Sequence, residues 1–410
     1  SMSMASLGAQ IDHLPGGGPY SFRIHGQLYH HVGPLHPQPG TRRSYGQIYF
    51  LDTLQAAEER LKVPANQKCD VSIMQELSTL MTEINVFAKS YKMMAEVEEQ
   101  EERDAVLAGR SSKPVRMVFD INDKKLDRRR FNLPTVNEVA VVYVQEDGDV
   151  PVSRSISAHP RDGGLVNIFD TDPSNDPMTY PLFFPRGELG WSMDMVREDN
   201  GTRKNLRVSQ KDYYTYLLQV RKDVFNPILH GGNLLQQYAV DAWVKTEQNR
   251  LRYHRENQAS IRAEEYQVLR DYVDGDKADG TPGRRVILPS SFQGSPRSMM
   301  QDYQDSMAIV ARHGKPDFFL TFTCNPAWKE ISENLLPGQT ASDRPDLVAR
   351  VFQMKVDELF DVLLKQHLLG EVKAYVVVVE WQKRGLPHIH TLLTMKDGHK
   401  PLSVDDIDRL

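Results

Sequence analysis

Three short segments between residues 317 and 395 constrain the fold most. Residues 317–323, 371–382 and 388–395 are rich in valine, isoleucine, threonine and aromatic residues, which is typical of β-strands. Between the first two, the apolar residues Val348, Phe352, Leu359 and Leu363 recur at helical spacing, and Gly370 follows. The sequence therefore predicts the order strand, helix, strand, strand.

That order corresponds to the first two-thirds of a ferredoxin-like β-α-β-β-α-β unit. Because 410 residues exceed what one hydrophobic core usually holds, we expect a multi-domain α+β protein. Its C-terminal domain, residues 286–410, is expected to be a ferredoxin-like β-α-β-β domain. We expect this domain to be incomplete at its C-terminus, since residue 410 is reached before a further helix and strand can form.

The upstream sequence divides by composition. Residues 1–20 are expected to be an expression-tag scar and a flexible lead-in, because glycine and proline follow a Ser-Met-Ser-Met start. We expect residues 21–205 to form a mixed α/β region, in which apolar residues recur at helical spacing over 54–62 and 71–104. Residues 206–285 predict a helical segment, including a long helix over about residues 233–273.

The net charge, the cysteine content and the hydropathy of the chain exclude several classes of protein. The formal net charge is −5, so any nucleic-acid surface must be a local basic patch. Two cysteines, Cys69 and Cys324, cannot form a four-cysteine zinc site or a disulfide framework, and they fit an intracellular, reducing compartment. The longest apolar run near the C-terminus, 374–379, is far shorter than the roughly 20 residues of a membrane helix, so we expect no membrane association.

A His-x-His pair lies on the last predicted strand. Side chains alternate along a strand, so His388 and His390 face the same side, as two ligands of one metal ion would. A hard divalent ion usually takes an oxygen ligand too, and Glu380 can lie beside the imidazoles if 383–387 is a hairpin turn. Gln382 is the competing third ligand, because it has the same parity and is nearer the turn. His-x-His pairs also occur on strands by chance.

The first predicted strand has two different faces. Leu320, Phe322 and Cys324 point to one side and predict a core face, whereas Thr321, Thr323 and Asn325 point to the other. The small polar groups can contact a phosphate or a base edge, although a half-exposed strand would have the same pattern. Lys383 and Arg384 in the turn are further candidate DNA contacts.

Several longer motifs resemble one family. Residues 319–326 (FLTFTCNP) resemble motif one of rolling-circle replication initiators, and residues 385–390 (GLPHIH) resemble their HUH motif. The segments 288–297, 321–326 and 380–388 are closer still to the helicase-like N-terminal region of Helitron transposases, and 132–140 and 176–185 are more loosely similar. The resemblance runs from about residue 20 onward, and it implies that residues 286–410 are an HUH, or Rep-like, nuclease domain that ends before its catalytic tyrosines.

The resemblance implies a single-stranded DNA endonuclease that depends on a divalent metal, Mg²⁺ or Mn²⁺. In this family the metal, held by two histidines, activates the scissile phosphate, and a tyrosine forms a 5′-phosphotyrosine link. His388 and His390 match the metal ligands, and Glu380 is the third ligand by strand pairing. The implied partners are single-stranded DNA at transposon ends and the nuclease and helicase parts that follow in the full-length protein. The implied location is intracellular, and nuclear in a eukaryotic host.

The sequence departs from the family in its tyrosines. No tyrosine follows Tyr375, so the catalytic tyrosines are expected after Leu410. Relaxases place the nucleophile before the histidines, which makes Tyr213, Tyr214 and Tyr216 a second candidate set, although aromatic packing is the simpler role. No phosphate-binding loop of the helicase type occurs. The alternative function is a non-catalytic DNA-binding or assembly module with a vestigial metal site.

Overall fold

The structure is a computed structural model in which the chain divides into two compact units. It describes residues 2–12, 20–113, 115–119, 141–144, 156–158, 165–198, 206–258, 287–381 and 385–408. Unit 1 comprises Ser1–Asp12 and Arg23–Gln219, and unit 2 comprises His13–Phe22 and Val220–Leu410. Each unit is considered by itself.

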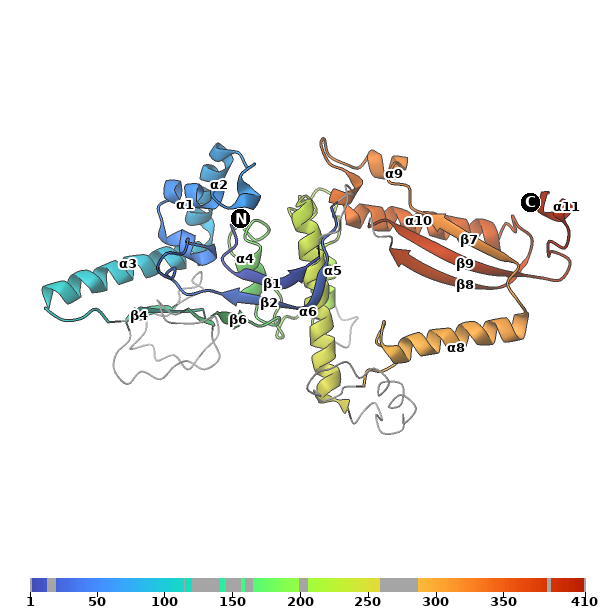
Figure 1. Cartoon of the computed structure of the whole chain (residues 1–410), viewed down its shortest axis with the longest axis horizontal. Coiled ribbons are helices and arrows are strands. Elements are labelled where there is room, and N and C mark those ends of the chain that lie inside the picture. The colour runs from blue at the N-terminus through green and yellow to red at the C-terminus, as the bar shows by residue number, and fades with distance from the viewer. Residues whose placement is uncertain are drawn as a thin grey trace. The chain divides into compact units, whose positions relative to one another are not determined.

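Unit 1 contains two small antiparallel sheets and a group of helices (Figure 1). One sheet has the order β1-β2-β6, from β1 (Ser6–Ile11), β2 (Ile24–Val32) and β6 (Val166–Ile168). The other has the order β4-β3-β5, from β3 (Val115–Phe119), β4 (Val141–Val144) and β5 (Ile156–Ala158). The helices are η1 (Tyr45–Phe50), α1 (Thr53–Leu61), η2 (Pro64–Asn66), α2 (Val71–Ile84), α3 (Val86–Leu107), α4 (Asn175–Thr179) and α5 (Gln210–Leu217).

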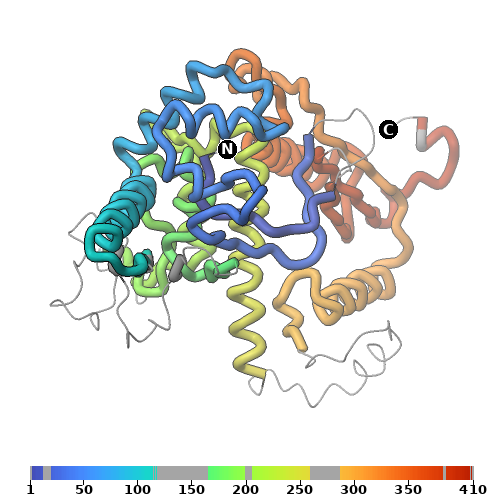
Figure 2. The backbone as a smooth tube through the Cα atoms, turned by 60° about the vertical axis from the view of Figure 1, so that its left-hand side comes forward, coloured from blue at the N-terminus to red at the C-terminus, as the bar shows by residue number. Residues whose placement is uncertain are grey.

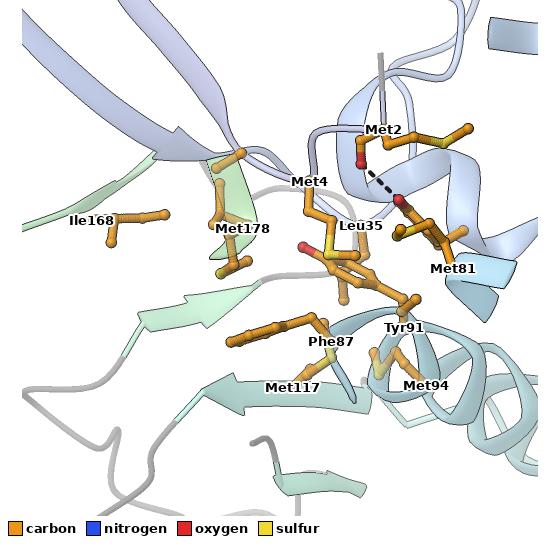
Figure 3. Packing of buried hydrophobic residues seen from close by; sticks show 14 of the residues in the cluster. Met2, Met4, Leu35, Met81, Phe87, Tyr91, Met94, Met117, Ile168 and Met178 are labelled. Atoms are coloured by element: carbon orange, nitrogen blue, oxygen red, sulfur yellow. Dashed lines mark hydrogen bonds between the residues drawn. The ribbon is translucent and has the colours of Figure 1, made fainter. Parts of the chain in front are cut away.

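Residues 2–12 are part of the fold of unit 1, so the flexible lead-in expected over residues 1–20 is wrong for this stretch. Met2 and Met4 are buried among other methionines and Tyr91, as Figure 3 shows. The Tyr49 hydroxyl donates to the Met2 carbonyl at 2.6 Å, and the Met4 amide donates to the Met178 carbonyl at 2.8 Å. The expectation relied on glycine and proline, but residues 13–19 that carry them lie outside the described residues. The apolar residues before them are buried.

Helical spacing over 71–104 predicts one helix, but the structure contains two. Asn85 ends α2 and begins α3, and its side-chain oxygen accepts hydrogen bonds from the amides of Phe87 and Ala88. Asparagine favours this N-cap position because its short side chain satisfies free amides of the first turn. The Asn85 amide group also donates to the Pro185 carbonyl at 3.1 Å, so the break is fixed by a tertiary contact.

Unit 2 contains the predicted strand, helix, strand, strand order. Its elements are α6 (Asn233–Glu256), α8 (Pro296–His313), β7 (Phe318–Thr323), α9 (Lys329–Ser332), η5 (Ala341–Asp343), α10 (Pro345–Leu364), β8 (Val372–Trp381), β9 (Pro387–Met395) and α11 (Val404–Asp408). The helix expected over 233–273 is confirmed as far as Glu256, and residues 259–286 lie outside the described residues. Within the described residues, no helix is both long and apolar enough to span a membrane.

The sheet of unit 2 has the order β7-β9-β8, and both pairings are antiparallel. In the backbone tube of Figure 2, the segments that form these strands are coloured orange to red and lie close together. The third strand in sequence therefore lies between the first two, with α10 in the connection from β7 to β8. The protein is thus mixed α/β, as expected. The more specific expectation, a ferredoxin-like β-α-β-β domain that is incomplete at its C-terminus, remains a prediction.

One face of this sheet packs against α10. Val348, Val351 and Phe352 of α10 are buried in a cluster with Cys324 and Ile389, and Phe322 stacks on Phe352 at 5.9 Å between ring centroids. Since side chains alternate, residues next to Ile389 on β9 face the other side of the sheet. Because Ile389 packs against α10, the side chains of His388 and His390 lie on the opposite face of the sheet.

Candidate metal centre

The two histidines lie on the central strand of the unit 2 sheet, between residues of both neighbouring strands. On one side, Glu380 of β8 is directly opposite His388. On the other side, Thr323 of β7 is opposite His388 and Thr321 is opposite His390. The hairpin pairing inferred from the sequence is therefore confirmed, and it places a carboxylate beside the two imidazoles.

The ligand atoms of these three residues converge. His388 Nε2 lies 3.1 Å from His390 Nε2, and Glu380 Oε2 lies 3.3 Å and 3.6 Å from the same two nitrogens. One potential ligand atom from each residue lies within 4.8 Å of the others, a grouping that can hold a metal ion. Side-chain exposure rises from 11% for His388 to 29% for His390 and 53% for Glu380, so the group is open to solvent on the carboxylate side.

Backbone geometry fixes the strand that carries the histidines. Gly385 has φ +79°, a left-handed conformation that favours glycine, just before the strand begins at Pro387. The Cys324 amide donates to the Pro387 carbonyl at 3.0 Å, which continues the β7–β9 pairing past His388. At the far end, the Asp317 carboxylate accepts from the Met395 amide at 2.7 Å. Because the backbone of β9 is hydrogen-bonded to β7 on one edge and to β8 on the other, the Cα positions of His388 and His390 are held firmly.

The expected polar face of β7 has more than one role. Thr321 and Thr323 are exposed on the histidine face, but the Thr321 hydroxyl lies 3.0 Å from Nδ1 of His390. Asn325 is exposed just beyond the strand, where its side-chain oxygen accepts from the Ala327 amide at 2.9 Å. Thr321 is therefore already engaged with a candidate ligand, while Thr323 stays available for a DNA contact.

Three of the candidate residues, Gln382, Lys383 and Arg384, lie outside the described residues. The choice between Glu380 and Gln382 as third ligand therefore remains open, although Glu380 is in place. The role of the two basic residues as DNA contacts likewise remains a prediction.

The upstream tyrosines belong to unit 1. Tyr214 is buried, with its hydroxyl 3.4 Å from the Asp176 carboxylate. Burial, with the charges of Asp176 and Glu188, raises the pKa of Tyr213 above its usual value. Tyr216 is exposed. A raised pKa disfavours the phenolate, and Tyr213 also packs edge-on against Tyr214 at 5.4 Å between ring centroids. These features accord with the packing role.

Sequence reasoning missed one residue beside the histidines. Phe319 is 67% exposed, yet its ring stacks on His390 with 5.3 Å between centroids and 16° between planes. Its alternation with Thr321 and Thr323 already assigns it to the polar face, and Thr321 lies opposite His390. Only the strand register, which the sequence does not state, reveals the ring contact.

The donor set suits a divalent cation. Two imidazoles and one carboxylate combine a nitrogen donor typical of Zn²⁺ and Fe²⁺ sites with an oxygen donor typical of Mg²⁺ and Mn²⁺ sites. Nδ1 of His388 is buried and has no hydrogen-bond partner within the described part of the chain. Two Nε2 atoms this close without a shared proton or cation would direct their lone pairs at each other. The residues therefore fit a metal ion.

One comparison with known proteins identifies a related family. Residues 213–393 match the family described as the Helitron helicase-like domain at N-terminus. The match runs from α5 to β9 and includes Glu380, His388 and His390. It does not reach the two looser resemblances upstream, at 132–140 and 176–185. No curated protein matches the chain.

Proposed function

We propose that this chain is the DNA-nicking region of a rolling-circle transposase, because residues 213–393 match the Helitron helicase-like domain at N-terminus. Its substrate is single-stranded DNA at transposon ends, and its reaction is HUH-type phosphodiester transfer dependent on Mg²⁺ or Mn²⁺. The main structural support for this proposal is that potential metal-binding atoms of Glu380, His388 and His390 lie close together on one face of the sheet.

The three side chains have distinct roles in this proposal. The Nε2 atoms of His388 and His390 and a carboxylate oxygen of Glu380 would hold the divalent cation. When bound, the cation supplies Lewis-acid activation of a phosphate oxygen. The exposed carboxylate side leaves room for a DNA strand to approach, and Thr323, with Lys383 and Arg384, would contact its phosphates.

The proposed reaction is a transesterification. A tyrosine oxygen forms a bond to phosphorus while the bond to the 3′-oxygen of the preceding nucleotide breaks. The tyrosine proton ends on that 3′-oxygen, so the products are a 5′-phosphotyrosine and a free 3′-hydroxyl. No tyrosine lies after Tyr375, so we propose that the nucleophile comes from outside residues 1–410.

A covalent-adduct assay tests this function. The 410-residue chain is incubated with single-stranded or duplex DNA and Mn²⁺, and DNA binding and intact protein mass are both measured. We expect binding that prefers single strands and is strengthened by Mn²⁺, without a DNA-linked protein.

Two outcomes would contradict parts of the proposal. An adduct that maps to Tyr213, Tyr214 or Tyr216 would place the nucleophile inside the chain. Binding without a single-strand preference and without a Mn²⁺ effect would instead favour an assembly module with a vestigial metal site.

A further inference from the structure

His390 is held on the side opposite its cluster-facing nitrogen. Its Nε2 lies in the cluster with His388 and Glu380, while its Nδ1 lies 3.0 Å from the Thr321 hydroxyl. Thr321 is directly opposite His390 in the β7–β9 register, so a strand pairing fixes this contact. Phe319 stacks on the same imidazole and limits its rotation. The ring is therefore restrained at an edge and on a face.

A hydrogen bond at one ring nitrogen decides the state of the other. A neutral imidazole carries one N–H, and its second nitrogen has the lone pair that binds a metal. If Nδ1–H of His390 donates to the Thr321 hydroxyl, then Nε2 keeps its lone pair and directs it at the cluster. Partners of this kind commonly set the tautomer and orientation of metal-binding histidines.

His388 has no equivalent partner within the described residues. Its Nδ1 is buried without a hydrogen bond, although Thr323 is opposite His388 just as Thr321 is opposite His390. The two threonines share strand, face and register relation, and they differ in this contact. They therefore form a matched pair for an experiment.

We propose that Thr321 is a positioning residue of the metal site, with its hydroxyl accepting Nδ1–H of His390 and thereby presenting Nε2 to a divalent cation. This inference rests on the metal site of the proposed function, and it replaces the DNA contact expected for Thr321. Thr321 acts through His390 and touches neither metal nor substrate.

Mn²⁺ affinity is the first measurement. Thr321→Val removes the hydroxyl and keeps the branched shape, so we expect Mn²⁺ binding, followed by titration calorimetry, to weaken about 10–100-fold. Thr321→Ser should retain most of the affinity, and Thr323→Val should bind Mn²⁺ like the wild-type chain. Unfolding of each variant without metal checks that the fold is intact. Equal affinity in Thr321→Val and wild type, or equal loss in Thr323→Val, would overturn the proposal.

The histidine tautomer is the second measurement, and it needs no metal. In the metal-free chain at about pH 8.5, where ordinary imidazoles are neutral, side-chain ¹⁵N spectra distinguish the two tautomers. We expect His390 to be protonated at Nδ1, and to become a mixture of tautomers in Thr321→Val. A His390 protonated at Nε2 in the wild type would overturn the proposal even if Mn²⁺ binds. If Mn²⁺ fails to bind while the tautomer is as expected, the metal site of the proposed function fails instead.

Discussion

At the scale of single residues, the site depends on which atoms the strand register brings together. Glu380 and Thr321 flank the central strand on opposite sides, and each meets a different part of the histidine pair. The Glu380 carboxylate lies near the Nε2 atoms of both histidines, whereas the Thr321 hydroxyl lies near Nδ1 of His390, on the other edge of that ring. A cation held by the cluster would therefore be separated from Thr321 by the imidazole of His390.

The histidine pair predicts a metal-dependent gain in stability. At a Mn²⁺ concentration of about 100 times Kd, binding to the folded state should add roughly 2.7 kcal/mol to the free energy of unfolding. We expect His388→Ala with His390→Ala to abolish the Mn²⁺-induced rise in melting temperature. His367→Ala, which removes an exposed histidine of the same unit, serves as control. A melting shift that survives in the double variant would remove these histidines from the site.

The third ligand can be assigned by comparing two variants. Because Glu380 Oε2 already lies 3.3 Å from His388 Nε2, we expect Glu380→Ala to reduce the Mn²⁺ melting shift more than Gln382→Ala does. Both variants are to be measured over the same Mn²⁺ titration. The reverse order would make Gln382 the third ligand.

The two cysteines should differ sharply in reactivity. Burial raises the pKa of the Cys324 thiol to about 11, whereas Cys69 is exposed. A raised thiol pKa keeps the unreactive, protonated form below that pH, so at about pH 8 only around one Cys324 in a thousand is thiolate. We expect iodoacetamide to modify Cys69 in the native chain and Cys324 only after unfolding. Equal modification of both in the native chain, by peptide mass, would contradict the burial.

At the scale of elements, the packing of α10 on β9 decides which way the histidines point. Ile389 is fully buried between the two ligand positions and belongs to the cluster formed by Val348, Val351 and Phe352. A slip of one residue in the register would exchange the faces and bury the imidazoles. The apolar side chain between the histidines therefore helps to fix the orientation of His388 and His390, the candidate metal ligands.

Truncation of the Ile389 side chain should lower the stability of the folded chain. We expect Ile389→Ala to lower the free energy of unfolding by about 2–5 kcal/mol, because it removes buried methylenes and leaves a cavity, and Ile389→Val by about 0.5–1.5 kcal/mol. Urea unfolding of both variants measures the difference. If the alanine variant lost no more than the valine variant, Ile389 would not be packed as described.

At the scale of the whole molecule, the candidate site is contained in one unit. Glu380, His388 and His390 all belong to unit 2, and the buried methionine core of the N-terminal residues belongs to unit 1. The net charge of −5 means that the proposed DNA binding cannot arise from overall attraction and would require a local basic surface.

Containment in one unit predicts where Mn²⁺ acts. We expect hydrogen exchange to slow in β7, β8 and β9 when Mn²⁺ is added, because the ion would link two adjacent strands, while the strands of unit 1 exchange as before. Mass spectrometry of peptides from the labelled chain measures this. Comparable protection in β1 and β2 would indicate a metal site elsewhere.

The sequence by itself determined the local features of this protein. Alternation in β7, the valines of β8 and the spacing of Val348 and Phe352 are enough to predict strands, a helix and a core face, because these patterns depend on residues close together in the chain. The His-x-His parity and the hairpin that brings Glu380 near are equally local. The family resemblance of unit 2 also lies in continuous motifs, and the match over residues 213–393 confirms it.

The tertiary structure decided whatever depends on partners distant in sequence. The bond from Thr321 to His390 and the stacking of Phe319 join residues about 70 positions apart, and no local pattern specifies which residues of β7 and β9 face each other. Burial of Met2 and Met4 was missed for the same reason, since their partners include Tyr49 and Met178. Periodicity reports which face of an element is apolar, whereas only packing and register determine what that face meets.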